Sequence, residues 1–211
     1  MAEVSGKGMH FVYETAGDGF PLVLAPGPQG VWSPYIPLLS ELCRTIMYTG
    51  HDLVQVPPAK ALHPSARAAA MLGTFLDILS LERAYLASQA VSWHTALLFA
   101  LHSPGRLEGL VLLGARDVET HTICGITALE ARLHAITVPT VVVIEAESRA
   151  ALPYADLLTE SLPHCTKFVV SDTIPAASSG MPALRLGHAM MRFLLHCERQ
   201  RTLVRGASFL L

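Results

Sequence analysis

Residues 85–102 read YLASQAVSWHTALLFALH, a strand pattern that passes directly into a helix pattern. The first three residues form a short apolar run, and residues 92–102 carry apolar side chains at helical spacing. Pro104 and Gly105 end this predicted helix. A strand followed at once by a helix is the repeating unit of parallel α/β sheets.

The same alternation continues on both sides of this stretch. Further strands are predicted at Met9–Glu14, Pro21–Ala25, Thr45–Tyr48, Leu110–Leu113, Thr140–Ile144 and Lys167–Val170. Helices are predicted to begin at Ser33 and Pro64, and a closing helix covers Leu184–Cys197. This order predicts an α/β fold with a doubly wound, mostly parallel sheet that has helices on both faces.

The composition fits one such domain and argues against several kinds of function. The chain has 211 residues, 51% hydrophobic and 15% charged, so residues 1–211 are expected to form a single domain. The net charge is −2 and no basic stripe is present, which argues against binding to nucleic acid or to a membrane surface. Because neither a signal peptide nor a membrane-spanning run is recognisable, a cytoplasmic location is expected.

The metal-binding and redox signals are weak. The four cysteines form no CxxC pair, and no two of the ten histidines have the HExxH spacing. We therefore expect buried thiols, no metal site and no cofactor.

Several segments resemble the α/β-hydrolase family. Residues 19–27 (GFPLVLAPG) are similar to the strand that enters the family's oxyanion loop, and residues 79–86 (LSLERAYL) to the stretch before its nucleophile. Residues 96–107 and 109–113 look like the helix after the nucleophile and the next strand, and residues 138–144 resemble the strand that carries the acid. Because these segments span nearly the whole chain in the family's order, the resemblance implies an α/β-hydrolase core.

The family's nucleophile position is altered. In the family, a serine at the centre of G-x-S-x-G lies on a strained turn between strand and helix. The matching residues 88–92 read SQAVS, so Ala90, which has no nucleophilic atom, takes the place of the serine. Two other registers, with Ser88 or Ser92 as the nucleophile, fit the flanking strand and helix less well.

The oxyanion loop of the family matches residues 26–30, which read PGPQG. In the family, this loop and the residue after the nucleophile each donate a backbone N–H to the oxyanion. Gly27 fits the pattern, but Pro28 stands at the donor position and has no N–H. The resemblance therefore leaves only the N–H of Val91 as a donor.

The acid and the general base of the family have no close counterparts. Ser148 is the best match to the acid, and Glu147 beside it would serve if the match shifts by one residue. The base histidine is expected in the window Thr173–Gly180, which contains no histidine. His188 follows a glycine but lies in the closing helix, where we expect a packing residue.

The cap that many family members carry over the active site is expected to be much reduced. The cap remnant, residues 115–137, leaves room for little more than a helix at Ala128–Ala135. A pocket over Ala90 would therefore exclude water poorly.

Three functional hypotheses follow. The first is an α/β-hydrolase-like protein without hydrolytic activity, which serves as a small-molecule binder, a regulatory subunit or a scaffold. The second is a lyase, isomerase or cyclase whose candidate groups are Gln89, Asp172, Glu147, Ser88, Ser92, Tyr48 and His51. The third is an ordinary carboxylester hydrolase in another register. A small apolar ligand is the expected partner, and the oligomeric state, including a homo-oligomer, stays open. The predicted pocket residues are Gly27, Pro28, Gln29, Ser88, Gln89, Ala90 and Val91.

Overall fold

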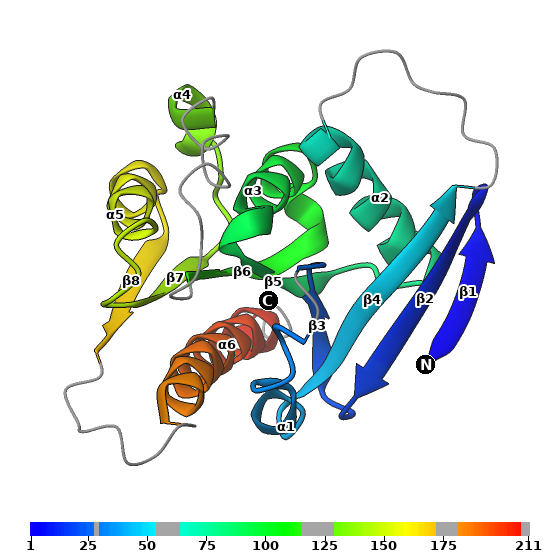
Figure 1. Cartoon of the computed structure of the whole chain (residues 1–211), viewed down its shortest axis with the longest axis horizontal. Coiled ribbons are helices and arrows are strands. Elements are labelled where there is room, and N and C mark those ends of the chain that lie inside the picture. The colour runs from blue at the N-terminus through cyan, green and yellow to red at the C-terminus, as the bar shows by residue number, and fades with distance from the viewer. Residues whose placement is uncertain (28–29, 54–63, 115–128, 172–180, 208–211) are drawn as a thin grey trace.

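A computed structural model describes residues 1–27, 30–53, 64–114, 129–171 and 181–207. Its centre is an eight-stranded sheet in the order β1-β2-β4-β3-β5-β6-β7-β8 (Figure 1). The strands are β1 (Ala2–Gly6), β2 (Met9–Ala16), β3 (Phe20–Leu24), β4 (Cys43–Leu53), β5 (Ala84–Gln89), β6 (Leu107–Gly114), β7 (Thr140–Glu145) and β8 (Cys165–Val170). β2 pairs antiparallel with β1 and β4, and the pairs from β4–β3 to β7–β8 are parallel. The predicted doubly wound, mostly parallel sheet is confirmed.

Helices cover both faces of this sheet (Figure 1). One face carries α2 (Pro64–Ile78), α3 (Trp93–His102), α4 (Glu130–Leu133) and α5 (Leu152–Ser161). The other face carries α1 (Ile36–Leu39) and α6 (Met181–Ala207). Two short 3₁₀ turns, η1 (Ala90–Ser92) and η2 (Pro104–Arg106), stand before α3 and β6. Each face has its own cluster of buried apolar side chains, so the sheet separates two halves of the core.

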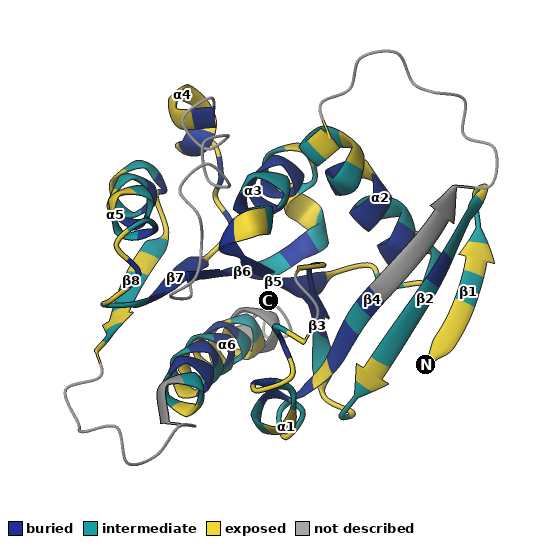
Figure 2. Ribbon diagram, viewed as in Figure 1, coloured by how far each residue is buried: buried dark blue, intermediate teal, exposed yellow. Residues whose placement is uncertain are grey.

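The central strands lie in the interior, and the edge strands are more exposed (Figure 2). Every residue of β5 is buried, and β7 is buried from Thr140 to Ile144. Helices can cover both faces of a strand that is apolar at successive positions, because no polar side chain is then buried away from water. This arrangement holds the carboxyl ends of β3, β5, β6 and β7 at one edge of the sheet, where α/β proteins form their sites.

The predicted elements are found, with differences at their ends. β4 continues to Leu53 and α6 to Ala207, beyond the predicted ends of both elements. The helix expected from Ser33 begins only at Ile36, because turns occupy the residues before it. Strand β1 was not predicted, since most of its residues face solvent and give no apolar alternation.

Cys43 and Cys197 are buried free thiols, as expected, whereas the free thiol of Cys165 is only partly buried. Cys124 lies outside the described residues. In the described parts of the chain, no three His, Cys, Asp or Glu side chains form a group that could hold a metal ion. None of the helices described there is long and apolar enough to cross a membrane.

Candidate functional site

Ala90 lies where β5 passes into α3. Gln89 ends the strand with extended backbone angles, φ −84° and ψ 163°, and η1 begins at Ala90. Ala90 is 1% exposed. The predicted position of Ala90, at a turn between strand and helix on the carboxyl edge of the sheet, is confirmed. We call residues 88–92 the elbow.

No residue of the elbow has a positive φ. Among the described non-glycine residues, only Lys7 and Ser80 have a positive φ, so Ala90 does not. A strained residue costs about 1–3 kcal/mol and persists only where the surrounding structure enforces it. The strain that the family resemblance implied for this turn is therefore absent at Ala90. The strained turn of the family exposes the nucleophile, and the methyl group of Ala90 is not a nucleophile, so this position does not require the strained geometry.

The two serines of the elbow use their hydroxyl groups on nearby carbonyl oxygens. Ser88 is fully buried, and its Oγ donates to the backbone oxygen of Gln89 at 3.2 Å. Ser92 is partly exposed, and its Oγ donates to the backbone oxygen of Pro26 at 2.7 Å. A serine becomes a nucleophile when a neighbouring base takes its proton. A carbonyl oxygen cannot act as that base, so this geometry offers no support for either alternative register.

The loop after β3 rests against the elbow. The N–H of Ala25 donates to the backbone oxygen of Ala87 at 2.8 Å, and the indole of Trp32 donates to the backbone oxygen of Ala25 at 2.8 Å. A Cβ on Gly27 would lie 3.9 Å from Oε1 of Gln89, so this buried amide approaches the loop. Pro28 and Gln29 lie outside the described residues, so their place among the predicted pocket residues stays a prediction.

Ser148, the best match to the acid, belongs to the turn that leads from β7 into α5. Its N–H donates to the backbone oxygen of Glu145 at 2.9 Å, and its own carbonyl accepts from Ala151 at 3.0 Å. Ser148 is 1% exposed, whereas Glu147 is exposed. The near-complete burial of Ser148 suits a small residue at this position, and a hydroxyl there cannot replace a carboxylate as the partner of an imidazole.

Glu145, the last residue of β7, is a carboxylate at this edge that was not among the predicted site residues. It is partly buried. Burial and, secondly, the charge of Glu145 raise the pKa of Tyr35 to about 12. Glu145 therefore acts electrostatically on a phenol of the loop that precedes α1.

The expected histidine positions give no base among the described residues. The window Thr173–Gly180 lies outside them, as do Asp172 and residues 115–128 of the cap remnant. In the described part of the remnant, α4 is shorter than the predicted Ala128–Ala135 helix. His188 is exposed on α6, so the prediction that it packs in the interior was wrong. Its neighbours Leu186 and Met190 are the buried ones, because they fall on the face that meets the sheet.

A cavity of about 510 Å³ opens beside the elbow, between the ends of β3, β4 and β5 and the helices α2 and α3. Apolar side chains form most of its wall, among them Ala25, Met71, Leu72, Leu86 and Ala96. Its polar side chains are Tyr48, Arg67, Ser92 and Thr95. We call it the elbow cavity. The predicted pocket residues Gly27, Ser88, Gln89, Ala90 and Val91 adjoin it in sequence but do not line it.

Part of the lining of this cavity could have been predicted from the sequence. Ser92, Thr95 and Ala96 fall on one face of the chain entering α3, at the spacing of one helical turn. Arg67 comes from α2, which the sequence comparison did not connect with the elbow. Burial raises the pKa of Tyr48, so this phenol stays protonated at neutral pH and can donate or accept a hydrogen bond there.

Comparison with known proteins supports the fold. No model of a known protein family matches the chain, and no curated protein matches its sequence. A meta-cleavage product hydrolase from Pseudomonas fluorescens has a similar structure, with a TM-score of 0.72, 14% identity and coverage of 93% of this chain and 98% of that chain.

Two further structures agree. An enol-lactonase from Burkholderia xenovorans has a TM-score of 0.69 at 15% identity, covering 92% of this chain and 100% of its own. A hydrolase from Pseudomonas aeruginosa has a TM-score of 0.66 at 18% identity, covering 92% and 97%. At such identities a structural match speaks for architecture and not for activity. The chain has the α/β-hydrolase fold.

Proposed function

We propose that this protein binds a small, largely apolar molecule in the elbow cavity and does not hydrolyse esters. One observation carries the proposal. The elbow presents a buried alanine without a positive φ, directly beside an apolar cavity of about 510 Å³. A binding protein needs the cavity, and only a hydrolase needs the nucleophile.

The chemistry of the elbow supports the absence of hydrolysis. Acyl transfer needs a nucleophile, a base that takes its proton and donors that hold the oxyanion. The methyl group of Ala90 cannot attack, and the hydroxyls of Ser88 and Ser92 donate to carbonyl oxygens. Loss of one oxyanion donor costs about 100- to 1000-fold in rate, and loss of the triad costs more.

The shape and lining of the elbow cavity support binding. Small-molecule pockets commonly measure about 300–1,000 Å³ and combine apolar walls with a few polar groups. The wall here has that composition, and the hydroxyls of Tyr48 and Thr95 with the guanidinium of Arg67 supply the polar groups. Arg67 forms no ion pair with any carboxylate of the described residues, so it is available to a polar end of the ligand.

Two measurements on the purified protein test this function. Hydrolysis of p-nitrophenyl acetate and butyrate should equal the buffer rate, and Ser88→Ala and Ser92→Ala should not change it. Turnover that either substitution abolishes would show that a serine register is correct and would overturn the proposal. Native mass spectrometry and titration with N-phenyl-1-naphthylamine, an uncharged fluorophore, should reveal one apolar molecule bound per chain.

A matched pair of substitutions on α2 locates the binding. Ala68 lines the elbow cavity, whereas Ala70 is exposed on the same helix outside it. Ala68→Phe should lower the affinity for the fluorophore at least about tenfold by filling the cavity, and Ala70→Phe should not. Equal thermal unfolding of the two variants would exclude misfolding. Equal affinity of the two variants would place the ligand elsewhere.

A non-hydrolytic enzyme is the second candidate, and Tyr48 is the observation that favours it. The Tyr48 side chain lines the elbow cavity, and burial raises its pKa, so the phenol keeps its proton and can donate a hydrogen bond to a substrate oxygen in a lyase or isomerase. Tyr48→Phe should then abolish conversion of the co-purified molecule without abolishing its binding, as followed by mass spectrometry. A wild-type protein that leaves the molecule unchanged would remove this candidate.

A further inference from the structure

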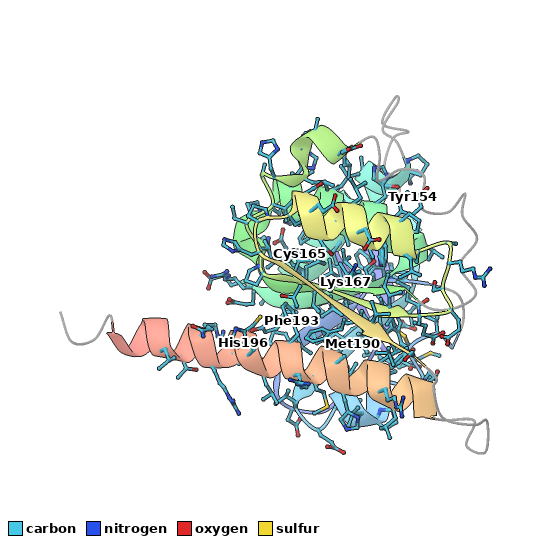
Figure 3. All side chains as sticks on the ribbon, turned by 90° about the vertical axis from the view of Figure 1, so that its left-hand side faces the viewer. Tyr154, Cys165, Lys167, Met190, Phe193 and His196 are labelled. Carbon is cyan, nitrogen blue, oxygen red and sulfur yellow. The ribbon has the colours of Figure 1, made fainter. Side chains whose placement is uncertain are left out.

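A second hollow of about 400 Å³ lies between α6 and the edge strand β8. Figure 3 looks onto this edge of the sheet, where β8 lies beside α6 and the labelled Phe193 and His196 belong to the helix. We call it the α6–β8 groove, and its lining includes Thr166, Phe168, Arg192, Phe193, His196 and Arg199. It does not share any lining residue with the elbow cavity.

Three basic side chains follow one another along the helix side of the groove. Arg192, His196 and Arg199 stand at positions i, i+4 and i+7, which places them on one face of α6. The two arginine Cα atoms are about 10 Å apart along the helix axis at the usual rise per residue. All three side chains are exposed. Two like charges on one helix face repel each other, and a bound anion would relieve this repulsion.

The charges of the two groove arginines are balanced differently from those of the arginines in the adjoining hollow. Within the described parts of the chain, no carboxylate forms an ion pair with Arg192 or Arg199. In an adjoining hollow on the same edge, by contrast, Arg83 and Arg201 reach Oε1 of Glu108 at 3.3 Å and 3.6 Å. The adjoining charges are thus neutralised within the protein, and those of the α6–β8 groove are not.

The groove also holds two partly buried phenyl rings, Phe168 and Phe193. The Phe193 ring rests against β6, since a Cβ on Gly109 would lie 3.4 Å from its Cε1 atom. This packing holds the ring in place beside the basic side chains. An aromatic surface next to unpaired guanidinium groups can take the flat apolar part of a ligand and its anionic group together.

We propose that the α6–β8 groove binds a small organic phosphate that carries a flat or aromatic part. A phosphate accepts hydrogen bonds from several directions, and here two guanidinium forks and the hydroxyl of Thr166 can donate from both sides of the groove. A single carboxylate is satisfied by one fork and would leave the second arginine unpaired. This inference does not rest on the function proposed for the elbow cavity.

Isothermal titration of the full chain with phenyl phosphate tests the proposal. Phenyl phosphate should bind one site, roughly fivefold tighter than inorganic phosphate because of the rings, and about tenfold tighter than benzoate. Arg192→Gln and Arg199→Gln should each weaken phenyl phosphate at least about tenfold. The control Arg44→Gln removes the same charge from an exposed position on β4 and should leave the affinity unchanged.

Three results would overturn this assignment. One is the absence of any heat of binding with phenyl phosphate at low salt. Another is an equal loss of affinity in Arg44→Gln and the groove variants, which would mean that net charge alone attracts the anion. The third is benzoate binding as tightly as phenyl phosphate. The groove variants should unfold at the wild-type temperature, since Arg192 and Arg199 form no ion pair with described residues.

Discussion

Ser92, at the start of α3, connects this helix to the loop after β3, and both segments line the elbow cavity. The family has glycine at this position, and a glycine could not make the 2.7 Å hydrogen bond that Ser92 Oγ donates to the Pro26 oxygen. The hydroxyl therefore holds the loop after β3 against the start of α3. A tie of this kind suits a preformed binding site, because less ordering is needed when the ligand enters.

Replacing each elbow serine with alanine should show that the Ser92 hydroxyl stabilises the protein and that the Ser88 hydroxyl has little effect on stability. Ser92→Ala loses a well-formed hydrogen bond, and we expect the free energy of unfolding to fall by about 1 kcal/mol. Ser88→Ala removes a longer bond, 3.2 Å, from a fully buried site and should be close to neutral, because the hydroxyl no longer has to be desolvated. Urea unfolding measures both values. A larger loss in Ser88→Ala would contradict this account.

Restoring a serine at the elbow should not restore an enzyme. Ala90→Ser adds a hydroxyl to a backbone without positive φ, so the side chain is not lifted as it is in a strained nucleophile turn. Among the described residues near it, none supplies a base to Ser88 or Ser92, and triad groups act as a unit. We expect a folded protein that is inert to activated esters and to a fluorophosphonate probe. Stoichiometric labelling at residue 90 would reveal an unrecognised base.

At the scale of elements, most of the sheet can be predicted from the sequence, because buried strands are recognisable as runs of apolar residues. The run from Leu110 to Leu113 is apolar at every position since helices cover both of its sides. The exposed strand β1 carries no such pattern and was missed. The position of Ala90 could likewise be predicted from its flanking strand and helix. The absence of a positive φ there was not predicted, because the family resemblance implied a strained turn although alanine by itself favours a negative φ.

The cavities were harder to predict than the strands. The residues of the elbow cavity come from α2, η1, α3, the strands β4 and β5 and the loop after β3, so their contact depends on how the helices pack and not on any local motif. The α6–β8 groove was not predicted for the same reason. Arg192 and Arg199 look like ordinary residues of an exposed helix face until Thr166 and Phe168 are placed opposite them.

The turn between β2 and β3 offers a sharp test of the element packing. A Cβ on Gly19 would lie 1.8 Å from the backbone oxygen of Leu42. Because this oxygen belongs to the main chain, it can make room for the Cβ only if the segment before β4 moves. Gly19→Ala should therefore destabilise the protein by about 3 kcal/mol or more. Gly105→Ala, where a Cβ would meet nothing within 4 Å, is the matched control and should be close to neutral. Thermal unfolding compares them, and similar midpoints would show that this turn is misplaced.

At the scale of the whole molecule, hydrogen bonds and ion pairs connect segments that are distant in sequence. Glu198 of α6 accepts from Tyr85 of β5 at 2.8 Å, which fastens the long helix to the middle of the sheet, and it also accepts from Arg201 of the same helix at 2.7 Å. On the opposite face, Asp77 near the end of α2 accepts from Lys7 at 2.6 Å and from Arg106 at 2.7 Å. One carboxylate thus links the β1–β2 turn, α2 and η2.

Asp77 should make the stability of the whole molecule depend on pH in the acid range. Hydrogen bonds from Lys7 and then from Arg106 lower the pKa of Asp77 in the folded protein. The folded state therefore binds this proton less readily than the unfolded state, whose carboxyl has a pKa of about 3.9. The contribution is fully present above that pKa and is lost as pH falls through the lower, folded value. Since the pair is exposed to solvent, we expect less than about 1 kcal/mol.

Urea unfolding at pH 6 and pH 3 measures this contribution. Asp77→Asn should be less stable than the wild type at pH 6, because a neutral amide holds Lys7 and Arg106 less strongly. At pH 3 the difference should shrink, because this pH lies below the unfolded-state pKa of about 3.9, where the lowered folded pKa of Asp77 no longer contributes in full. Asp18→Asn is the control, an exposed carboxylate in the β2–β3 turn that has no ion pair with any described residue, and its effect should be smaller at pH 6. A deficit of Asp77→Asn that stays the same from pH 6 to pH 3 would show that Asp77 acts through shape and not through its charge.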